Sequence, residues 1–241
     1  MKNIFFVGFL LCSIFTYSQD LKNGFVSLNA GPSLPSGDFK ADDVTEISSS
    51  FAKTGFLLDL NIGFNLSEKI GLMAKFRHYN FAVNDSKMEQ NFMKYGPFHR
   101  IFINSDPWEV SGGYSGVFVM LPVGPEGKTG IFDFKVLAGI SRTVKPRTNI
   151  DLHGKYGTEK SIIFSRKATS AAFIFGGGFK YFLSKSVAFN INADYFYTSA
   201  EFEKGEQLSI SDDRSAFIFD LLEYEQNVEI LSFSFGVSCM F

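Results

Sequence analysis

The stretch that decides the fold is Gly55-Phe-Leu-Leu-Asp-Leu-Asn-Ile-Gly-Phe-Asn-Leu66. Its apolar side chains recur at every second position from Phe56 to Leu66, and Asp59 and Asn61 fall between them. Because successive side chains of a β-strand point to opposite faces, this period predicts a strand with one apolar face and one polar face. An amphipathic helix would instead place its apolar residues three and four positions apart.

The same alternation recurs along the chain and predicts eight strands, around residues 26–30, 56–66, 70–76, 117–123, 132–140, 173–181, 187–195 and 231–241. Short links (67–69, 124–130 and 184–186) alternate with long polar links (34–54, 83–108, 145–168 and 199–226). Outer-membrane barrels have short periplasmic turns and longer extracellular loops. We therefore predict an all-β protein, an eight-stranded antiparallel up-and-down transmembrane β-barrel with short periplasmic turns and four long extracellular loops.

A soluble barrel with its apolar face inward would show the same alternation. The more polar face is rich in Gly, Ser and Asn, which suits a crowded interior better than a solvated surface. The other face carries many of the chain's 30 Phe residues. The clearest predicted strand, residues 56–66, is also long enough for the roughly 9–11 residues that cross a bilayer at a tilt. These features favour the membrane barrel.

Residues 1–18 are expected to be a secretory signal peptide, and residues 19–241 the barrel domain. Lys2 precedes an apolar run from Ile4 to Phe15, and Thr16-Tyr17-Ser18 forms a small-x-small cleavage site. The apolar run is shorter than the roughly 20 residues of a spanning helix. Leu11 before Cys12 argues against a lipoprotein anchor. Export and the barrel pattern together predict a multi-pass protein of the cell outer membrane, surrounded by its lipid.

Composition excludes several functional classes. The chain has 23 Lys and Arg against 25 Asp and Glu, so it lacks the excess of basic residues that is typical of a nucleic-acid-binding protein. We therefore expect no nucleic acid as a partner. Two Cys and three His do not make a zinc site, and we expect no metal and no cofactor. After removal of the signal peptide, Cys239 would be the one remaining thiol, either unpaired or intermolecular.

The C-terminus resembles the signal that bacterial outer-membrane proteins present to the barrel assembly machinery. Ser234, Gly236 and the terminal Phe241 match its polar, glycine and aromatic positions, whereas Cys239 stands where an aromatic residue is usual. The resemblance implies the assembly machinery as a partner.

More widely, the chain resembles the PorT-like outer-membrane β-barrel family of Bacteroidetes. The resemblance lies in Val117-Phe-Val-Met-Leu-Pro-Val123, in the strand from Phe132 to Ser141, and in Gly176–Tyr181 followed by Leu183–Val187. It implies the fold and the location rather than an activity. Because some members act in type IX secretion and gliding, it also suggests a component of a secretion or cell-surface assembly.

The predicted register turns charged side chains into the lumen. An eight-stranded barrel is just wide enough for side chains to fill, and buried charges must be paired. We therefore expect a structural ion network that plugs the barrel, although a proton or ion relay is an alternative interpretation. Its expected members are Asp59, Lys75, Arg77, Asp133, Lys135, Lys180 and Asp194.

No residue is predicted to be catalytic, and we expect no enzyme. A lipid-modifying barrel would need a Ser/His pair, and the sequence around His78 has no nearby serine. The second long link is unusually apolar, which favours a surface that contacts protein partners. A narrow channel or transporter is the alternative to this structural or binding role, and a lipid-modifying enzyme is less favoured. The candidate contact residues are Phe92, Tyr95, Phe98, Phe102 and Trp108.

Overall fold

The computed structural model describes residues 24–43, 49–95, 98–124, 129–154, 157–213 and 215–241. Within these residues, eight strands form a closed barrel, each antiparallel to both of its neighbours. The predicted signal peptide, residues 1–18, lies outside the described residues. The barrel strands are β1 (Gly24–Ser36), β2 (Gly55–Asn65), β3 (Ile70–Phe81), β5 (Trp108–Val123), β6 (Gly130–Lys145), β9 (Arg166–Phe182), β10 (Val187–Phe202) and β13 (Tyr224–Met240).

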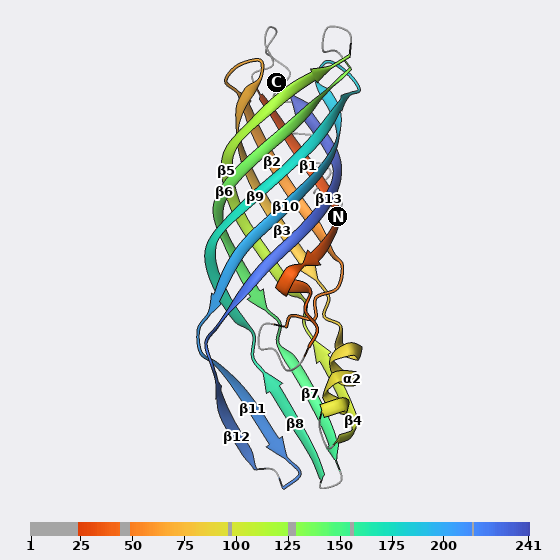
Figure 1. Cartoon of the computed structure of the whole chain (residues 1–241), viewed down its shortest axis with the longest axis vertical. Helices are drawn as coiled ribbons and strands as arrows, with labels where there is room; N and C mark the ends of the chain where they lie inside the picture. Colours follow the sequence, from red (N-terminus) through yellow and green to blue (C-terminus); the bar gives the residue numbers. More distant parts are fainter. Residues whose placement is uncertain (1–23, 44–48, 96–97, 125–128, 155–156, 214) are drawn as a thin grey trace, which may run out of the picture.

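The strand order around the barrel is β1-β13-β10-β9-β6-β5-β3-β2. The first and last strands therefore meet, and Val26 of β1 lies opposite Cys239 of β13. Figure 1 shows the strands tilted around a common axis, with the short turns at the upper end and the long connections at the lower end. The predicted fold class is confirmed.

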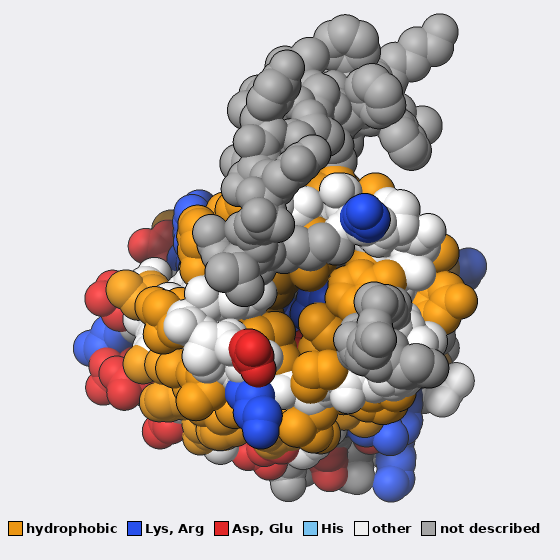
Figure 2. Space-filling view, turned by 90° about the horizontal axis from the view of Figure 1, so that it is seen from above, with side chains coloured by type: hydrophobic (Ala, Val, Ile, Leu, Met, Phe, Trp, Pro, Cys, Tyr) orange, Lys and Arg blue, Asp and Glu red, His pale blue; other side chains and the backbone are white. Residues whose placement is uncertain are grey.

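The lipid-facing surface follows the predicted alternation. Phe134 is 57% exposed, whereas the neighbouring Asp133 and Lys135 are buried inside the barrel. Figure 2, seen from the short-turn end, shows hydrophobic side chains over much of the barrel's outline. An apolar outer band around a polar interior is the surface of a barrel that sits in lipid. Among the described residues, no helix is long and apolar enough to cross a membrane.

The four connections predicted to be long loops contain regular structure. Residues 83–108 contain the helix α2 (Asp85–Tyr95), and residues 34–54 contain the short 3-10 helix η1 (Gly37–Lys40). A second, five-stranded sheet stands beyond the barrel in the order β12-β11-β8-β7-β4 (Figure 1). These strands are β4 (Phe98–Ser105), β7 (Thr148–Gly154), β8 (Gly157–Ile163), β11 (Gly205–Ser211) and β12 (Ala216–Leu221).

The second sheet, here called the extracellular sheet, continues the barrel hairpins. β6 ends at Lys145 and β7 begins at Thr148, so the chain passes between the two sheets within a few residues. Ile101, Ile103 and Ile150 are buried on one face of this sheet, where they pack against α2. The sequence does not reveal this arrangement because each of these strands has only six to eight residues and lacks a long period-two pattern.

Aromatic side chains fill the lumen at the level where the barrel meets the extracellular sheet. Trp108 lies against Phe39, with ring centroids 5.4 Å apart, and its indole nitrogen donates to the carbonyl of Ser50 at 2.9 Å. At the opposite end, Phe25 and Phe118 pack edge to face at 5.7 Å. The charged side chains of the lumen lie between these two apolar layers.

The lipid-facing assignment predicts a depth-dependent cost for a charge. Val136→Arg places a cation in the apolar band and should lower the free energy of unfolding by about 2–4 kcal/mol. Glu109→Arg, at an exposed position near the start of β5 and opposite Val144 and Asn80, should cost about 0–1 kcal/mol. Denaturant titration in lipid vesicles, followed by the fluorescence of the single Trp, measures both. Equal costs would contradict the assignment.

Candidate functional site

The seven charged residues expected in the lumen all point into it. They come from β2, β3, β6, β9 and β10, which surround one central volume. None is more than 6% exposed. With three acids and four bases the group carries one excess positive charge. The members are Asp59, Lys75, Arg77, Asp133, Lys135, Lys180 and Asp194.

Asp194 is the centre of this lumen network. Lys75 Nζ lies 2.8 Å and Lys135 Nζ 3.0 Å from its carboxylate oxygens. Arg77 pairs with the same carboxylate and reaches Asp59 at 2.7 Å. One carboxylate therefore pairs with three cations from two strands. Arg77 forms a second ion pair, with Asp59.

Asp133 holds the other end of the network. Lys180 Nζ lies 2.6 Å from its carboxylate, and Lys135 Nζ lies 3.6 Å away. Lys135 therefore links the Asp133 end to Asp194. Lys135 also donates to the amide oxygen of Asn192 at 2.9 Å.

Neutral side chains that the sequence reasoning did not single out complete the network. Asn29 and Asn61 donate to Asp59 at 2.7 and 3.0 Å, and Arg77 donates to the hydroxyl of Tyr79 at 2.8 Å. Their inward strand positions were the available signal. Gly176 leaves room for the network, because a Cβ there would lie 2.0 Å from the Asp194 carboxylate. The lumen is thus filled by side chains that bond to one another.

Neutralising the centre of the network should destabilise the barrel. Asp194→Asn leaves three buried cations short of a carboxylate, and breaking such a pair costs about 3–5 kcal/mol. Asp106→Asn, at an exposed position between β4 and β5, should change the free energy of unfolding by no more than about 0.5 kcal/mol. Urea titration in micelles checks both, and an unchanged Asp194→Asn protein would mean that water already screens the lumen charges.

Two of the three predicted assembly residues lie in the closing strand β13, and Phe241 directly follows it. Ser234 points into the lumen, and Gly236 packs so tightly on β1 that a Cβ would lie 2.1 Å from the Leu28 carbonyl oxygen. Phe241 exchanges two backbone hydrogen bonds of 3.0 Å with Gly24. The described residues include no free cysteine, so the expectation that Cys239 is unpaired or intermolecular receives no support.

The predicted contact residues do not form one surface in the structure. Trp108 is only 1% exposed and belongs to the aromatic layer of the lumen, so its assignment to a contact surface is wrong. Phe92 lies on α2 and packs against the extracellular sheet, whereas Phe102 on β4 is 46% exposed. Tyr95 is the last residue of α2 and Phe98 the first of β4.

An exposed apolar segment lies instead in the fourth long connection. β12 is the last strand of the extracellular sheet, and β11 is its one strand partner among the described residues. Ile218 is 68% exposed, and Phe217 and Phe219 on the opposite face are each more than half exposed. An uncovered apolar edge strand is uncommon in soluble parts of proteins, because it invites pairing with another chain.

One hydrogen bond shows which backbone groups of β12 are open. The amide of Ser211 donates to the carbonyl of Ser215 at 3.0 Å, across the turn between β11 and β12. Since hydrogen-bonded pairs recur at every second residue of an antiparallel ladder, Phe217 and Phe219 bond to β11. The amide and carbonyl groups of Ile218 therefore point to the open edge.

A Ser/His pair is present, although the sequence around His78 predicts none. His78 Nδ1 lies 2.8 Å from Ser111 Oγ, because β3 and β5 pair in this register. Both side chains lie on the outer face. Among the described residues, no carboxylate bonds to the other ring nitrogen of His78, so the pair lacks the group that orients a catalytic histidine.

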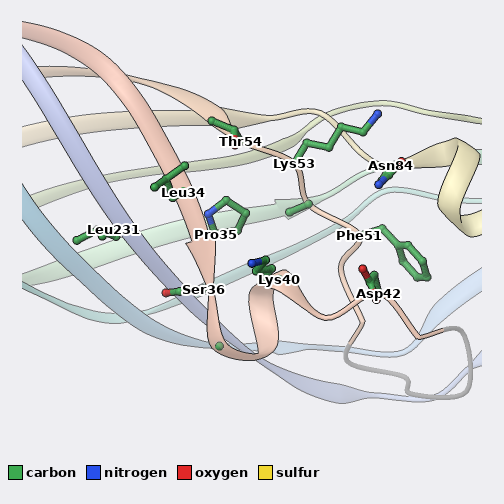
Figure 3. A pocket seen from close by; sticks show the side chains of 12 residues that line it. Leu34, Pro35, Ser36, Lys40, Asp42, Phe51, Lys53, Thr54, Asn84 and Leu231 are labelled. Carbon is green, nitrogen blue, oxygen red and sulfur yellow. The ribbon is translucent and has the colours of Figure 1, made fainter.

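A groove of about 950 Å³ lies beside the barrel rim, between β1, η1 and the segment before β2. Figure 3 shows Lys53 extended toward Asn84 and away from Lys40. Asp42, also in its lining, pairs with Lys87 of α2. The charges of this groove are therefore dispersed or already paired. The described residues contain no cluster of His, Cys, Asp and Glu able to hold a metal ion.

Comparison with solved structures shows that most of the chain is similar in fold to bacterial outer-membrane proteins. A major outer membrane protein from Thermus thermophilus superposes with a TM-score of 0.50 at 10% identity, covering 90% of this chain and 99% of that one. Ail, the attachment invasion locus protein of Yersinia pestis, gives 0.42 at 12% identity, covering 91% and 99%. Neisserial surface protein A gives 0.41 at 12% identity, covering 90% and 97%.

At these identities the similarity concerns the fold alone. No protein-family model matches the chain, and no curated protein matches it in sequence. Together with the closed strand order, the apolar outer band and the filled lumen, the comparison leads to one conclusion. This chain has the fold of a small, eight-stranded outer-membrane β-barrel.

Proposed function

We propose that this protein is a non-enzymatic binding component of the outer membrane, which captures an extended segment of a partner protein on the open edge of β12. The single observation that carries the proposal is the exposed apolar edge strand with outward-facing backbone groups at Ile218. Strand addition to such an edge gives affinity through main-chain hydrogen bonds and specificity through alternating side chains.

The chemistry of β12 defines the segment that would fit. Phe217 and Phe219 offer apolar contacts on one face, and Ile218 offers them on the other. Asp220 lies opposite Glu206 on β11, so two carboxylates stand side by side at this end of the edge. A complementary segment is extended, carries apolar residues on both faces and has a Lys or Arg next to these acids.

The proposal also covers how the protein reaches the outer membrane and which assembly it belongs to. Residues 1–18 would direct export, and the C-terminal Ser234, Gly236 and Phe241 would engage the assembly machinery. The resemblance to PorT-like barrels supports a place in a secretion or cell-surface assembly. A filled lumen favours this role over a channel, and the incomplete His78–Ser111 pair favours it over a lipid-modifying enzyme.

A backbone substitution tests strand addition. Ile218→Pro removes the outward amide donor but leaves the bonds of Phe217 and Phe219 to β11 in place. The purified barrel should bind the fluorescent probe peptide Lys-Val-Ile-Val-Ile-Val-Lys, which is apolar on both faces, and Ile218→Pro should weaken that binding at least tenfold in fluorescence anisotropy. Ile218→Thr, which keeps the amide, is the matched control and should stay within about threefold of the wild type.

Two outcomes would sink the proposal. One is equal binding by the Ile218→Pro and Ile218→Thr proteins. The other is equal binding of a probe whose alternate amides are N-methylated, because such a peptide cannot complete the ladder.

Conductance separates this role from the channel alternative. The ion-paired lumen should keep the wild-type protein silent in planar bilayers, because its charges bond to one another and leave no hydrated path. Single-channel recording at both polarities measures this. Reproducible unitary currents that change in the Asp133→Asn protein would favour the channel instead.

A further inference from the structure

A second pocket lies where the barrel joins the extracellular sheet, and all four long connections line it. Its volume is about 450 Å³, within the range of roughly 300–1,000 Å³ that is usual for small-molecule sites. Phe51 comes from the first connection, Met88 and Phe92 from α2, Ile163 from the third connection and Leu222 from the fourth. Side chains from separate parts of the chain therefore converge on one mostly apolar space, here called the junction pocket.

Two cations line the junction pocket without an acidic partner. Lys145 at the end of β6 and Arg166 at the start of β9 lie directly opposite each other in the barrel ladder. Like charges in that position repel and destabilise a sheet. Among the described residues, no carboxylate lies within salt-bridge distance of either side chain, although Asp220 also lines the pocket. The three charges leave an excess of one positive charge.

Tyr224 lies beneath both cations. Lys145 Nζ is 4.6 Å and Arg166 Cζ 5.0 Å from the centroid of its ring, which stacks on Phe202 at 5.3 Å. Arg166 also donates to the carbonyl of Leu222 at 3.0 Å. The hydroxyl of Tyr224 and the Nε of Arg166 are nevertheless buried without a hydrogen-bond partner. Because buried polar groups in proteins are nearly always hydrogen-bonded, we expect these two donors to bond to an acceptor that a ligand would supply.

We propose that the junction pocket binds an anionic amphiphile, a small molecule with an apolar body and a carboxylate or phosphate head. The head would lie between Lys145 and Arg166, relieving their repulsion. The body would lie against Met88, Phe92 and Ile163. This site is distinct from the edge of β12, and neither proposal depends on the other.

The pKa of Lys145 makes anion binding at this pocket dependent on pH. Burial and the neighbouring Arg166 lower the pKa of Lys145 to about 8. The other groups facing it are Tyr224 and, across the pocket, Asp220. A bound anion would favour the charged amine and raise this pKa. Binding should therefore be full below pH 8 and weaken as the pH rises above it, because the neutral amine no longer attracts the head.

The test uses the full-length barrel in nanodiscs of zwitterionic phosphatidylcholine, titrated calorimetrically with octanoate, octyl phosphate, octanol and inorganic phosphate. We expect at least one of the two anionic amphiphiles to bind at least tenfold more tightly than octanol and than inorganic phosphate. The two anionic probes distinguish a fatty-acid head from a phospholipid-like head. Equal affinity for octanoate, octyl phosphate and octanol would overturn the proposal, as would equal affinity for inorganic phosphate.

Variants locate the binding. Lys145→Gln and Arg166→Gln should each weaken the better anionic probe at least tenfold, whereas Arg147→Gln should stay within about twofold. Arg147 is an exposed cation in the same connection and does not line the pocket. A loss of affinity in the Arg147→Gln protein as large as that of Lys145→Gln would mean a nonspecific charge effect and would overturn the site.

Thermal unfolding keeps the test decisive if affinities are weak. Lys145→Gln removes one of two repelling charges, so its Tm without ligand should exceed that of the wild type. The anionic probe should raise the Tm of the wild type and leave that of Lys145→Gln unchanged. A lower Tm for Lys145→Gln, or the same ligand shift in both proteins, would contradict the proposal.

Discussion

The structure depends on the closure of one hydrogen-bonded ladder. A strand in lipid has no water to satisfy its amides and carbonyls, so every barrel strand needs a partner on both sides. The pairing of β1 with β13 meets this need and removes the open edges that an eight-stranded sheet would otherwise have. Closure also fixes a lumen so narrow that its side chains must fill it and satisfy one another.

The need for strand closure differs between the membrane and the water outside it. Within the barrel, Asp194 holds three cations, and the network around it favours a rigid support over a path for solutes. Beyond the barrel, water satisfies the backbone, so closure is no longer required. The hairpins open into a five-stranded sheet that ends at β12. In this outer part Ile218 has no strand partner on its open edge, and Lys145 and Arg166 have no acidic partner among the described residues. The two binding proposals rest on these groups.

The period-two pattern predicts much of this molecule because it is local. Asp59 and Lys75 point inward, and Phe56 and Phe76 point outward, as the alternation of their own strands requires. The short links fall where the pattern stops. The assignment of Trp108 to a contact surface fails for a local reason as well, because the sequence of a long link does not show whether an apolar side chain is exposed or turns into the lumen.

The sequence by itself determined the eight barrel strands, their faces and the barrel class, since alternation, strand length and link length are properties of neighbouring residues. Only the tertiary structure decided which distant residues meet. It brought Ser111 to His78, Asn29 to Asp59 and Arg166 to Lys145, and it joined five short strands from three connections into one sheet. Such pairs depend on strand register across the closed ladder, which no single segment specifies.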